Sequence, residues 1–143
     1  MSSGGKDLPA TTTPALGRAI DPKHQVLVIE DEPIIGIYLQ DLLSDLGVEV
    51  CGLAASGGAA LALAAEHRPR VALVDIGLDG ELDGITVAQA MAERHGTAIV
   101  FLSGDAEAEH DPRVTALAPI AFLVKPYFPD DLEAALVKAF GAV

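Results

Sequence analysis

The chain has 143 residues, a length typical of one domain, and half of them are hydrophobic, which is enough to build a core. Lys and Arg number 9 against 21 Asp and Glu, so the formal net charge is −12. A surface this acidic repels phosphate backbones and anionic lipid headgroups, which argues against nucleic-acid and membrane partners.

Other features of the sequence narrow the class of protein further. The single cysteine, Cys51, excludes an internal disulfide and a cysteine-rich zinc site. A secretory signal is absent, and no apolar run approaches the ~18 residues that span a bilayer, so we expect a cytoplasmic protein. Residues 1–23 are rich in Ser, Gly, Thr and Pro and predict a flexible extension ahead of one folded domain over residues 24–143.

Five short apolar runs follow the extension, each four to six residues long and largely β-branched. They predict strands at residues 26–29, 48–53, 71–74, 98–102 and 120–124. Because the runs are almost unbroken in hydrophobicity, we expect burial on both faces, as in a parallel sheet.

Helical patterns lie between these strands. Each begins at a proline or at a side chain that can cap a first turn: Pro33, Ser56, Asp83 or Thr86, and Pro129. The fourth helix is interrupted by Pro112, which predicts an irregular segment over residues 104–110 and a short helix over residues 112–117. Strands alternating with helical segments predict an α/β domain of three layers, a doubly wound five-stranded parallel sheet.

Polar side chains follow four of the predicted strands. Glu30 and Asp31 come after the first strand, Asp75 after the third, Ser103 after the fourth and Lys125 after the fifth. Since ligands of open α/β sheets bind beyond the carboxyl ends of the strands, we expect these side chains to meet at one edge.

The chemistry of this set indicates phosphoryl transfer. Neighbouring carboxylates repel one another unless a cation joins them, and Mg²⁺ accepts one or two carboxylates together with phosphate oxygens. Lys125 offers a positive charge and Ser103 a hydroxyl to an anion beside that metal. Asp75, alone after its strand, is the best candidate for a nucleophile.

The segments VLVIEDEP, VALVDIGLDGELDGI, IVFLSGDA and AFLVKPY resemble, in order and spacing, the response-regulator receiver domains of two-component signalling. The resemblance covers residues 24–143 and implies a flavodoxin-like fold with strand order 2-1-3-4-5. It also implies that Asp75 accepts a phosphoryl group from a histidine kinase or a histidine phosphotransfer protein.

The remaining roles implied by the resemblance concern the metal, the phosphoryl group and the switch. Mg²⁺ would be held by Glu30, Asp31, Asp75 and the backbone carbonyl of Gly77. Ser103 and Lys125 would contact the acyl phosphate, and Ser103 and Phe122 would form the conformational switch.

The chain departs from the family pattern at four places. Ser103 stands where Thr is commoner, and Phe122 replaces a frequent Tyr, so no phenol hydroxyl serves the switch. The loop after Asp75 lacks the proline that many members carry, and Pro112 interrupts the helix on the family's usual output face. The site chemistry tolerates these changes, whereas the signalling surface is altered.

Three functions compete for this residue set. We favour a stand-alone phosphorylation switch, not an enzyme, that assists only its own phosphorylation and dephosphorylation and signals by binding an unknown downstream protein. The enzymatic alternative is a phosphohydrolase of the haloacid dehalogenase type, but Gly77 occupies the place of its general acid Asp. The third is a binding module that works unphosphorylated, against which the complete set of acids, Ser and Lys argues.

Ile34 and Ile37 lie off the buried stripe of the first predicted helix. Because Ile34 follows the acidic residues closely, we expect this apolar patch to help dock the helix that donates the phosphoryl group.

Overall fold

The computed structural model describes residues 25–78 and 82–142, and the predicted extension over residues 1–23 lies outside them. The elements in chain order are β1 (Gln25–Ile29), α1 (Pro33–Asp45), β2 (Glu49–Ala54), α2 (Gly57–His67), β3 (Val71–Asp75), α3 (Gly84–His95), β4 (Ala98–Ser103), the 3₁₀ helix η2 (Ala106–His110), α4 (Pro112–Leu117), β5 (Ala121–Val124) and α5 (Pro129–Ala142). Within this described part, every helix is too short or too polar to cross a lipid bilayer.

The strands form one parallel sheet in the order β2-β1-β3-β4-β5, which confirms the predicted α/β class and strand order. The order reverses between β1 and β3. The carboxyl ends of these two neighbouring strands therefore lie side by side. The connections that leave them pass to opposite faces of the sheet, which leaves a crevice where a ligand can bind.

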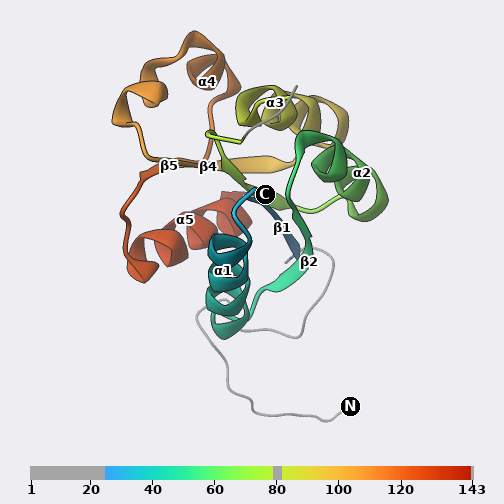
Figure 1. The fold of residues 1–143 in the computed structure, drawn as a ribbon, viewed down its shortest axis with the longest axis vertical. Coiled ribbons are helices and arrows are strands. Elements are labelled where there is room, and N and C mark those ends of the chain that lie inside the picture. The colour runs from blue at the N-terminus through green and yellow to red at the C-terminus, as the bar shows by residue number, and fades with distance from the viewer. Residues whose placement is uncertain (1–24, 79–81, 143) are drawn as a thin grey trace.

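Helices cover both faces of the sheet, as Figure 1 shows. Leu39 of α1 and Leu136 of α5 pack against Val28 and Leu73 on one face. Met91 of α3 and Val114 of α4 pack with the opposite side chains of the same strands on the other face, where α2 also lies. Successive strand residues thus point into different cores, which explains why the strands are apolar at every position.

Several helix ends follow the sequence chemistry. The side chain of Ser56 accepts a hydrogen bond from the backbone N–H of Ala59 (3.2 Å), and Asp83 accepts one from Thr86 (2.8 Å), so both predicted caps are confirmed. At the other end of α3, Gly96 has a φ of 68°, a left-handed conformation that glycine adopts without a steric penalty.

The region around Pro112 is partly as predicted. The short helix α4 has the expected bounds, with Pro112 in its first turn and Asp111 as its cap. The prediction of an irregular segment over residues 104–110 is wrong for residues 106–110, which form η2. The reason is local, because Asp105 caps this 3₁₀ helix by accepting a hydrogen bond from the backbone N–H of Glu107 (2.9 Å).

Candidate functional site

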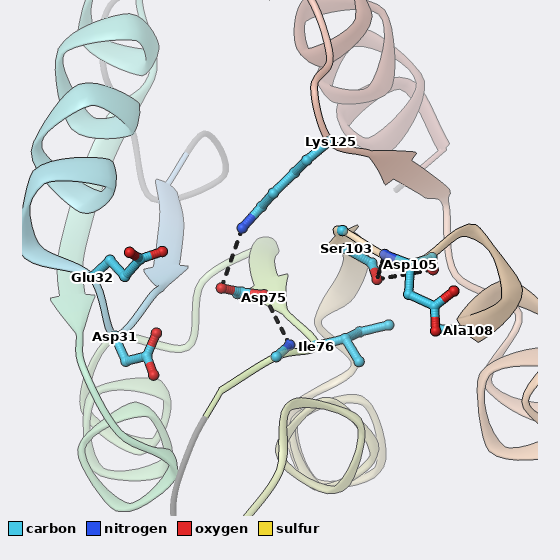
Figure 2. Close-up of a pocket in the computed structure, with 10 residues that line it drawn as sticks. Asp31, Glu32, Asp75, Ile76, Ser103, Asp105, Ala108 and Lys125 are labelled. Atoms are coloured by element: carbon cyan, nitrogen blue, oxygen red, sulfur yellow. Dashed lines mark hydrogen bonds and ion pairs between the residues drawn. The ribbon is translucent and has the colours of Figure 1, made fainter.

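Most of the predicted site residues converge at the carboxyl edge of the sheet, around a cleft of about 580 Å³ (Figure 2). The lining comes from four strand ends and the loops that follow: Asp31, Glu32, Asp75, Ile76, Gly77, Ser103, Gly104, Asp105, Ala108 and Lys125. Sequence reasoning placed Asp31, Asp75, Gly77, Ser103 and Lys125 at this edge.

Backbone hydrogen bonds hold the key residues in register just beyond the sheet. The N–H of Glu30 donates to the carbonyl of Ala54 (2.9 Å), and the N–H of Lys125 donates to the carbonyl of Ser103 (2.7 Å). Asp75 is itself the last residue of β3 and is buried. The charged side chains therefore start from hydrogen-bonded backbone, which keeps their Cα atoms close together at this edge.

Lys125 joins two carboxylates across the cleft. Its Nζ lies 3.4 Å from Oδ2 of Asp75 and 3.7 Å from Oε1 of Glu30. The side chain of Lys125 is 30% exposed, whereas those of Glu30 and Asp75 are 0% and 8% exposed. One partly solvated ammonium thus faces two buried acids, and the peptide bond that follows it, Lys125–Pro126, is cis.

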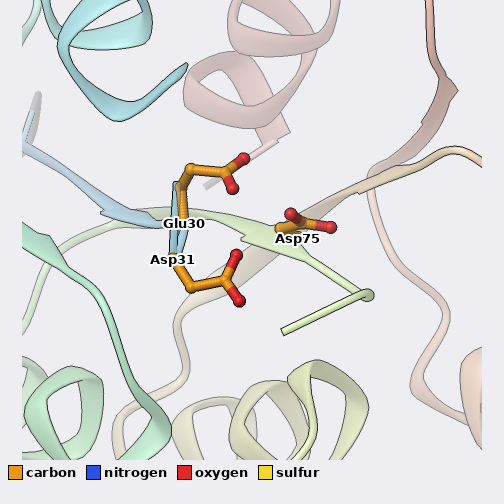
Figure 3. Close-up of side chains that lie close together, drawn as sticks. All are labelled: Glu30, Asp31 and Asp75. Carbon is orange, nitrogen blue, oxygen red and sulfur yellow. The ribbon is translucent and has the colours of Figure 1, made fainter. Parts of the chain in front are cut away.

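Glu30, Asp31 and Asp75 bring carboxylate oxygens within 4.8 Å of one another (Figure 3). Burial raises the pKa of Glu30 from 4.5 to about 7, and the negative charge of Asp75 adds to that rise. A hydrogen bond from the backbone N–H of Glu32 to Oε2 of Glu30 (3.1 Å) and the charge of Lys125 act in the opposite direction. The desolvation of the Glu30 carboxylate outweighs both of these effects, so its pKa is raised.

The residues present fit a divalent cation. Oε1 of Glu30 is buried and has no hydrogen-bond partner among the described residues. Buried oxygen acceptors in proteins almost always receive a hydrogen bond. A buried carboxylate oxygen that receives none, next to two further carboxylates, is therefore a suitable ligand for a cation. Oxygen donors of this kind are those that Mg²⁺ prefers.

Gly77 lines the cleft, where its backbone carbonyl was expected as a metal ligand. The contact that the structure shows is made by its N–H, which donates to Oδ1 of Asp75 (2.9 Å). This bond orients the Asp75 carboxylate, with Oδ1 on Gly77 and Oδ2 on Lys125. The role of the carbonyl stays a prediction.

Ser103 is buried at the end of β4, and its hydroxyl is hydrogen-bonded to the loop that follows the strand. Oγ accepts a hydrogen bond from the N–H of Asp105 (2.9 Å) and donates to the carbonyl of Asp105 (3.0 Å). Two hydrogen bonds thus tie the hydroxyl to one residue of the turn. Ser103 lacks the methyl group of Thr, so rotation about χ1 toward the cleft meets less restriction.

Phe122 lies away from the carboxylates, on β5. Its ring is half-buried beside Phe101, with ring centroids 6.3 Å apart and planes inclined by 54°. It also lines a second cleft of about 360 Å³, whose walls include Val114 and Thr115 of α4. Its surroundings therefore connect β5 with α4.

Sequence reasoning missed three residues that line the site cleft, namely Ile76, Asp105 and Ala108, whereas Glu32 directly follows the predicted acidic pair. For Asp105 a signal was present. The sequence Ser103-Gly104-Asp105 has the chemistry of a tight turn directly after a strand, and turn residues at this edge face the ligand side of the sheet. Ile76 and Ala108 carry no such signal, because apolar residues line clefts and cores alike.

Comparisons with known proteins agree with this geometry. The family described as the response regulator receiver domain matches residues 26–137. The transcriptional regulatory protein PdtaR of Mycobacterium tuberculosis is 32% identical over 116 residues, which cover 81% of this chain and 56% of that protein. The phyllosphere-induced regulator PhyR of Methylorubrum extorquens is 29% identical over 122 residues, which cover 85% of this chain and 45% of that protein. The chain thus spans about half the length of these relatives.

Solved structures show the same fold. The signal receiver domain of a modulated diguanylate cyclase from Desulfovibrio desulfuricans matches with a TM-score of 0.77 and 32% identity, covering 82% of this chain and 94% of that one. The receiver domain of PhyR from Erythrobacter litoralis matches with a TM-score of 0.72 and 27% identity, covering 82% and 90% of the two chains.

Proposed function

This chain belongs to the response regulator receiver domain family, and we propose that it is a phosphoacceptor switch in which Asp75 receives a phosphoryl group from a phosphohistidine. The donor is a histidine kinase or a histidine phosphotransfer protein. We assign residues 24–143 to the receiver domain and residues 1–23 to a segment ahead of it, and we place the action of the domain in the cytoplasm. The comparisons give no support to the haloacid dehalogenase alternative.

One observation carries the proposal: two buried carboxylates, Glu30 and Asp75, share the partly solvated ammonium of Lys125 at the edge of the sheet. Such a set costs stability, because burying charges is expensive and Oε1 of Glu30 accepts no hydrogen bond from the described residues. A structural role would be served better by apolar side chains. The arrangement is explained if an incoming cation and an incoming anion complete it.

The transfer requires one bond to form and one to break. An oxygen of the Asp75 carboxylate forms a bond to phosphorus while the bond from phosphorus to the imidazole nitrogen of the donor breaks. Lys125, already 3.4 Å from Asp75, offsets the negative charge on the phosphoryl oxygens. The N–H of Gly77 holds the other carboxylate oxygen in place.

Glu30, Asp31, Asp75 and the carbonyl of Gly77 would hold Mg²⁺. When bound, the metal supplies positive charge that stabilises the transferring phosphoryl group. Without such charge, two acids next to the nucleophile would repel the phosphoryl oxygens.

The signal would leave the site through Ser103 and Phe122. Rotation of the Ser103 hydroxyl toward the phosphoryl oxygens breaks its two hydrogen bonds with Asp105 and loosens the turn before η2. Phe122, in a cleft shared with α4, then repacks and alters the surface read by a downstream protein.

The donor would dock on α1. Ile34 and Ile37 are 80% and 55% exposed, and α1 begins beside Glu32, which lines the site cleft. Exposed isoleucines this close to a reacting group favour a contact with a partner's apolar helix face. Ile34→Ala should slow transfer from the kinase but not from a small phosphodonor. Val137→Ala, at an exposed position of α5, is the matched control; equal slowing by Ile34→Ala with both donors would refute the docking role.

The proposal is tested with acetyl phosphate, which needs no partner protein. Wild-type protein with Mg²⁺ should gain the mass of one phosphoryl group, and Asp75→Asn should gain none, as read by intact mass spectrometry. Asp105→Asn, a carboxylate of the same cleft outside the acidic cluster, is the control and should still be labelled. Retained labelling of Asp75→Asn would place the nucleophile elsewhere.

A further inference from the structure

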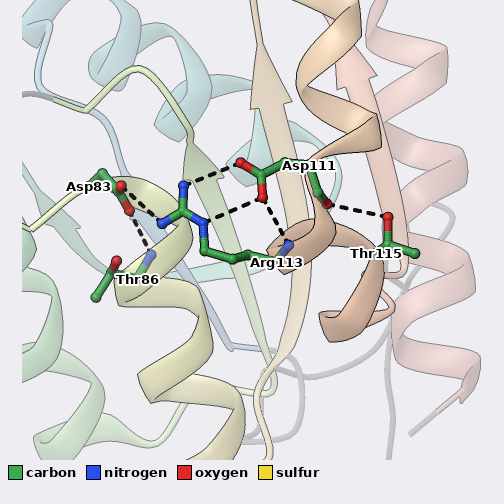
Figure 4. A network of polar contacts seen from close by, with 5 residues as sticks. All are labelled: Asp83, Thr86, Asp111, Arg113 and Thr115. Carbon is green, nitrogen blue, oxygen red and sulfur yellow. Dashed lines mark hydrogen bonds and ion pairs between the residues drawn. The ribbon is translucent and has the colours of Figure 1, made fainter.

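A second group of charges, outside the site cleft, joins α3 to α4 (Figure 4). Nη1 of Arg113 lies 3.2 Å from Oδ2 of Asp83, and Nη2 lies 3.3 Å from Oδ2 of Asp111. Nε of Arg113 also donates to Oδ1 of Asp111 (3.4 Å). We call these three residues the clasp. Asp83 and Arg113 are 30 positions apart in sequence, so the clasp is a tertiary contact.

Both carboxylates of the clasp are also helix caps. Asp83 caps α3 through Thr86, and Asp111 caps α4 by accepting a hydrogen bond from the N–H of Arg113 (2.8 Å). The clasp therefore ties together the first turns of two helices. Hydrogen bonds from the Arg113 side chain and backbone lower the pKa of Asp111. The pKa of Asp83 is lowered chiefly by the backbone hydrogen bond from Thr86, and Arg113 adds a smaller effect. Without Arg113, two anions would face each other.

The α3 end of the clasp lies against the backbone of Asp75, the proposed phosphoacceptor. Gly84, the first residue of α3, lies so close to Asp75 that a Cβ atom on it would come within van der Waals overlap of the Asp75 carbonyl oxygen and 3.0 Å from Cα of Ile76. A displacement of the backbone at Asp75 therefore pushes directly on the turn that holds Asp83.

The α4 end of the clasp is lightly anchored. Of the six residues of α4, all within the described part of the chain, only Val114 is buried. Val114 and Thr115 also form one wall of the cleft that contains Phe122. A helix with one buried side chain relies on its polar contacts to stay in place, and a change in those contacts changes the cleft.

We infer that Arg113 is a positioning residue that couples the backbone at Asp75 to α4, so that the clasp transmits phosphorylation to the wall of the Phe122 cleft. The inference rests on the proposed function for its trigger. The coupling itself is a property of the fold, carried by Gly84 against Asp75 at one end and by Arg113 against Asp83 at the other.

Hydrogen–deuterium exchange of the backbone amides over residues 112–118 tests the inference. Arg113→Gln removes the cation and keeps both caps, whereas Asp83→Asn removes the anion and keeps an asparagine able to cap α3. In the absence of phosphodonor, each variant should raise exchange in this segment about threefold, as expected for loss of exposed ion pairs. Arg94→Gln, which removes a charge from the exposed last turn of α3, is the control and should leave exchange unchanged.

Acetyl phosphate with Mg²⁺ supplies the second half of the experiment. Phosphorylation should change exchange over residues 112–118 in the wild type, and this response should be lost in Arg113→Gln although its mass still increases by one phosphoryl group. Wild-type exchange in Arg113→Gln without donor, or a full wild-type response with donor, would overturn the clasp. Absence of any mass increase in the wild type would instead contradict the proposed function, and the donor-free comparison would still decide on the clasp.

Discussion

Two sets of two carboxylates and one cation lie in the part of the chain that the structure describes, and they differ mainly in burial. In the first set Lys125 lies between Glu30 and Asp75, whose side chains are 0% and 8% exposed. In the second Arg113 lies between Asp83 and Asp111, whose side chains are 46% and 30% exposed. The ion-pair distances are similar, from 3.2 to 3.7 Å.

The effects on the carboxylates are opposite. Burial raises the pKa of Glu30 to about 7, and its Oε1 accepts no hydrogen bond from any described residue. Hydrogen bonds instead lower the pKa of Asp83 and of Asp111. Water completes the solvation of the exposed set. The buried set lacks this solvation, and we expect that lack to suit it to bind a cation and an anionic phosphoryl group.

The largest expected effect comes from removing the buried set's cation. Lys125→Met should slow labelling of Asp75 by acetyl phosphate by about 100-fold, because a preorganised charge on the transferring group is lost. Arg113→Gln, which removes the cation of the exposed set, should keep the wild-type rate. Initial rates from intact mass measure both, and equal rates for Lys125→Met and Arg113→Gln would remove the distinction between the two sets.

A second prediction concerns pH and stability without metal. The folded protein holds the Glu30 proton more tightly than the unfolded chain, so stability present below pH 4.5 is lost as the pH rises from 4.5 to about 7. Glu30→Gln, which carries no titrating proton, should therefore exceed the wild type in free energy of unfolding by about 1–3 kcal/mol at pH 8 in EDTA.

Denaturant unfolding at several pH values from 4.5 to 8 measures this difference. The advantage of Glu30→Gln should grow across the window and then stay constant. Asp83→Asn is the control from the exposed set, where no such growth with pH is expected. A Glu30→Gln variant that is less stable than the wild type at pH 8 would show that the Glu30 carboxylate is satisfied in the free protein.

A third, smaller effect is expected on adding metal. Mg²⁺ at ten times its Kd should stabilise the wild type by about 1.4 kcal/mol, since the folded cluster binds it and the unfolded chain does not. Thermal unfolding should show a rise in Tm that Asp31→Asn loses. Glu32→Gln changes a neighbouring carboxylate outside the cluster and should keep the rise; if both variants keep it, the cation binds elsewhere.

Much of the fold and site was predictable because the signals are local or follow from strand order. Uninterrupted apolar strands require burial on both faces of the sheet. Parallel strands place their carboxyl ends at one edge, so the sequence alone predicted that Asp75 and Lys125 lie close together. Pro112 likewise fixed the start of α4, because proline is tolerated only in a first turn.

The rest depends on three-dimensional distances that no local pattern encodes. The hydroxyl of Ser103 was expected to serve the cleft, but in the structure it bonds Asp105, a choice set by the turn geometry. The orphaned oxygen of Glu30 results from packing around β1. In the sequence, Arg113 is an ordinary surface residue of a short helix. Its contact with Asp83 follows only from the packing of α3 beside α4.

The smallest expected effect follows from the Ser103 turn. Ser103→Ala should lower the free energy of unfolding by about 1 kcal/mol, because two neutral hydrogen bonds with Asp105 are lost. Ser103→Thr keeps the hydroxyl and should retain most of this stability. Denaturant unfolding distinguishes the two, and an alanine variant as stable as the wild type would mean that the turn does not depend on the hydroxyl.

The most direct test of the central claim is to locate the phosphoryl group. After incubation with acetyl phosphate, proteolysis and tandem mass spectrometry should find a single phosphoryl group on Asp75 when Mg²⁺ is present and none when EDTA replaces it. A phosphoryl group on another side chain, or equal labelling of Asp75 in EDTA, would contradict the account.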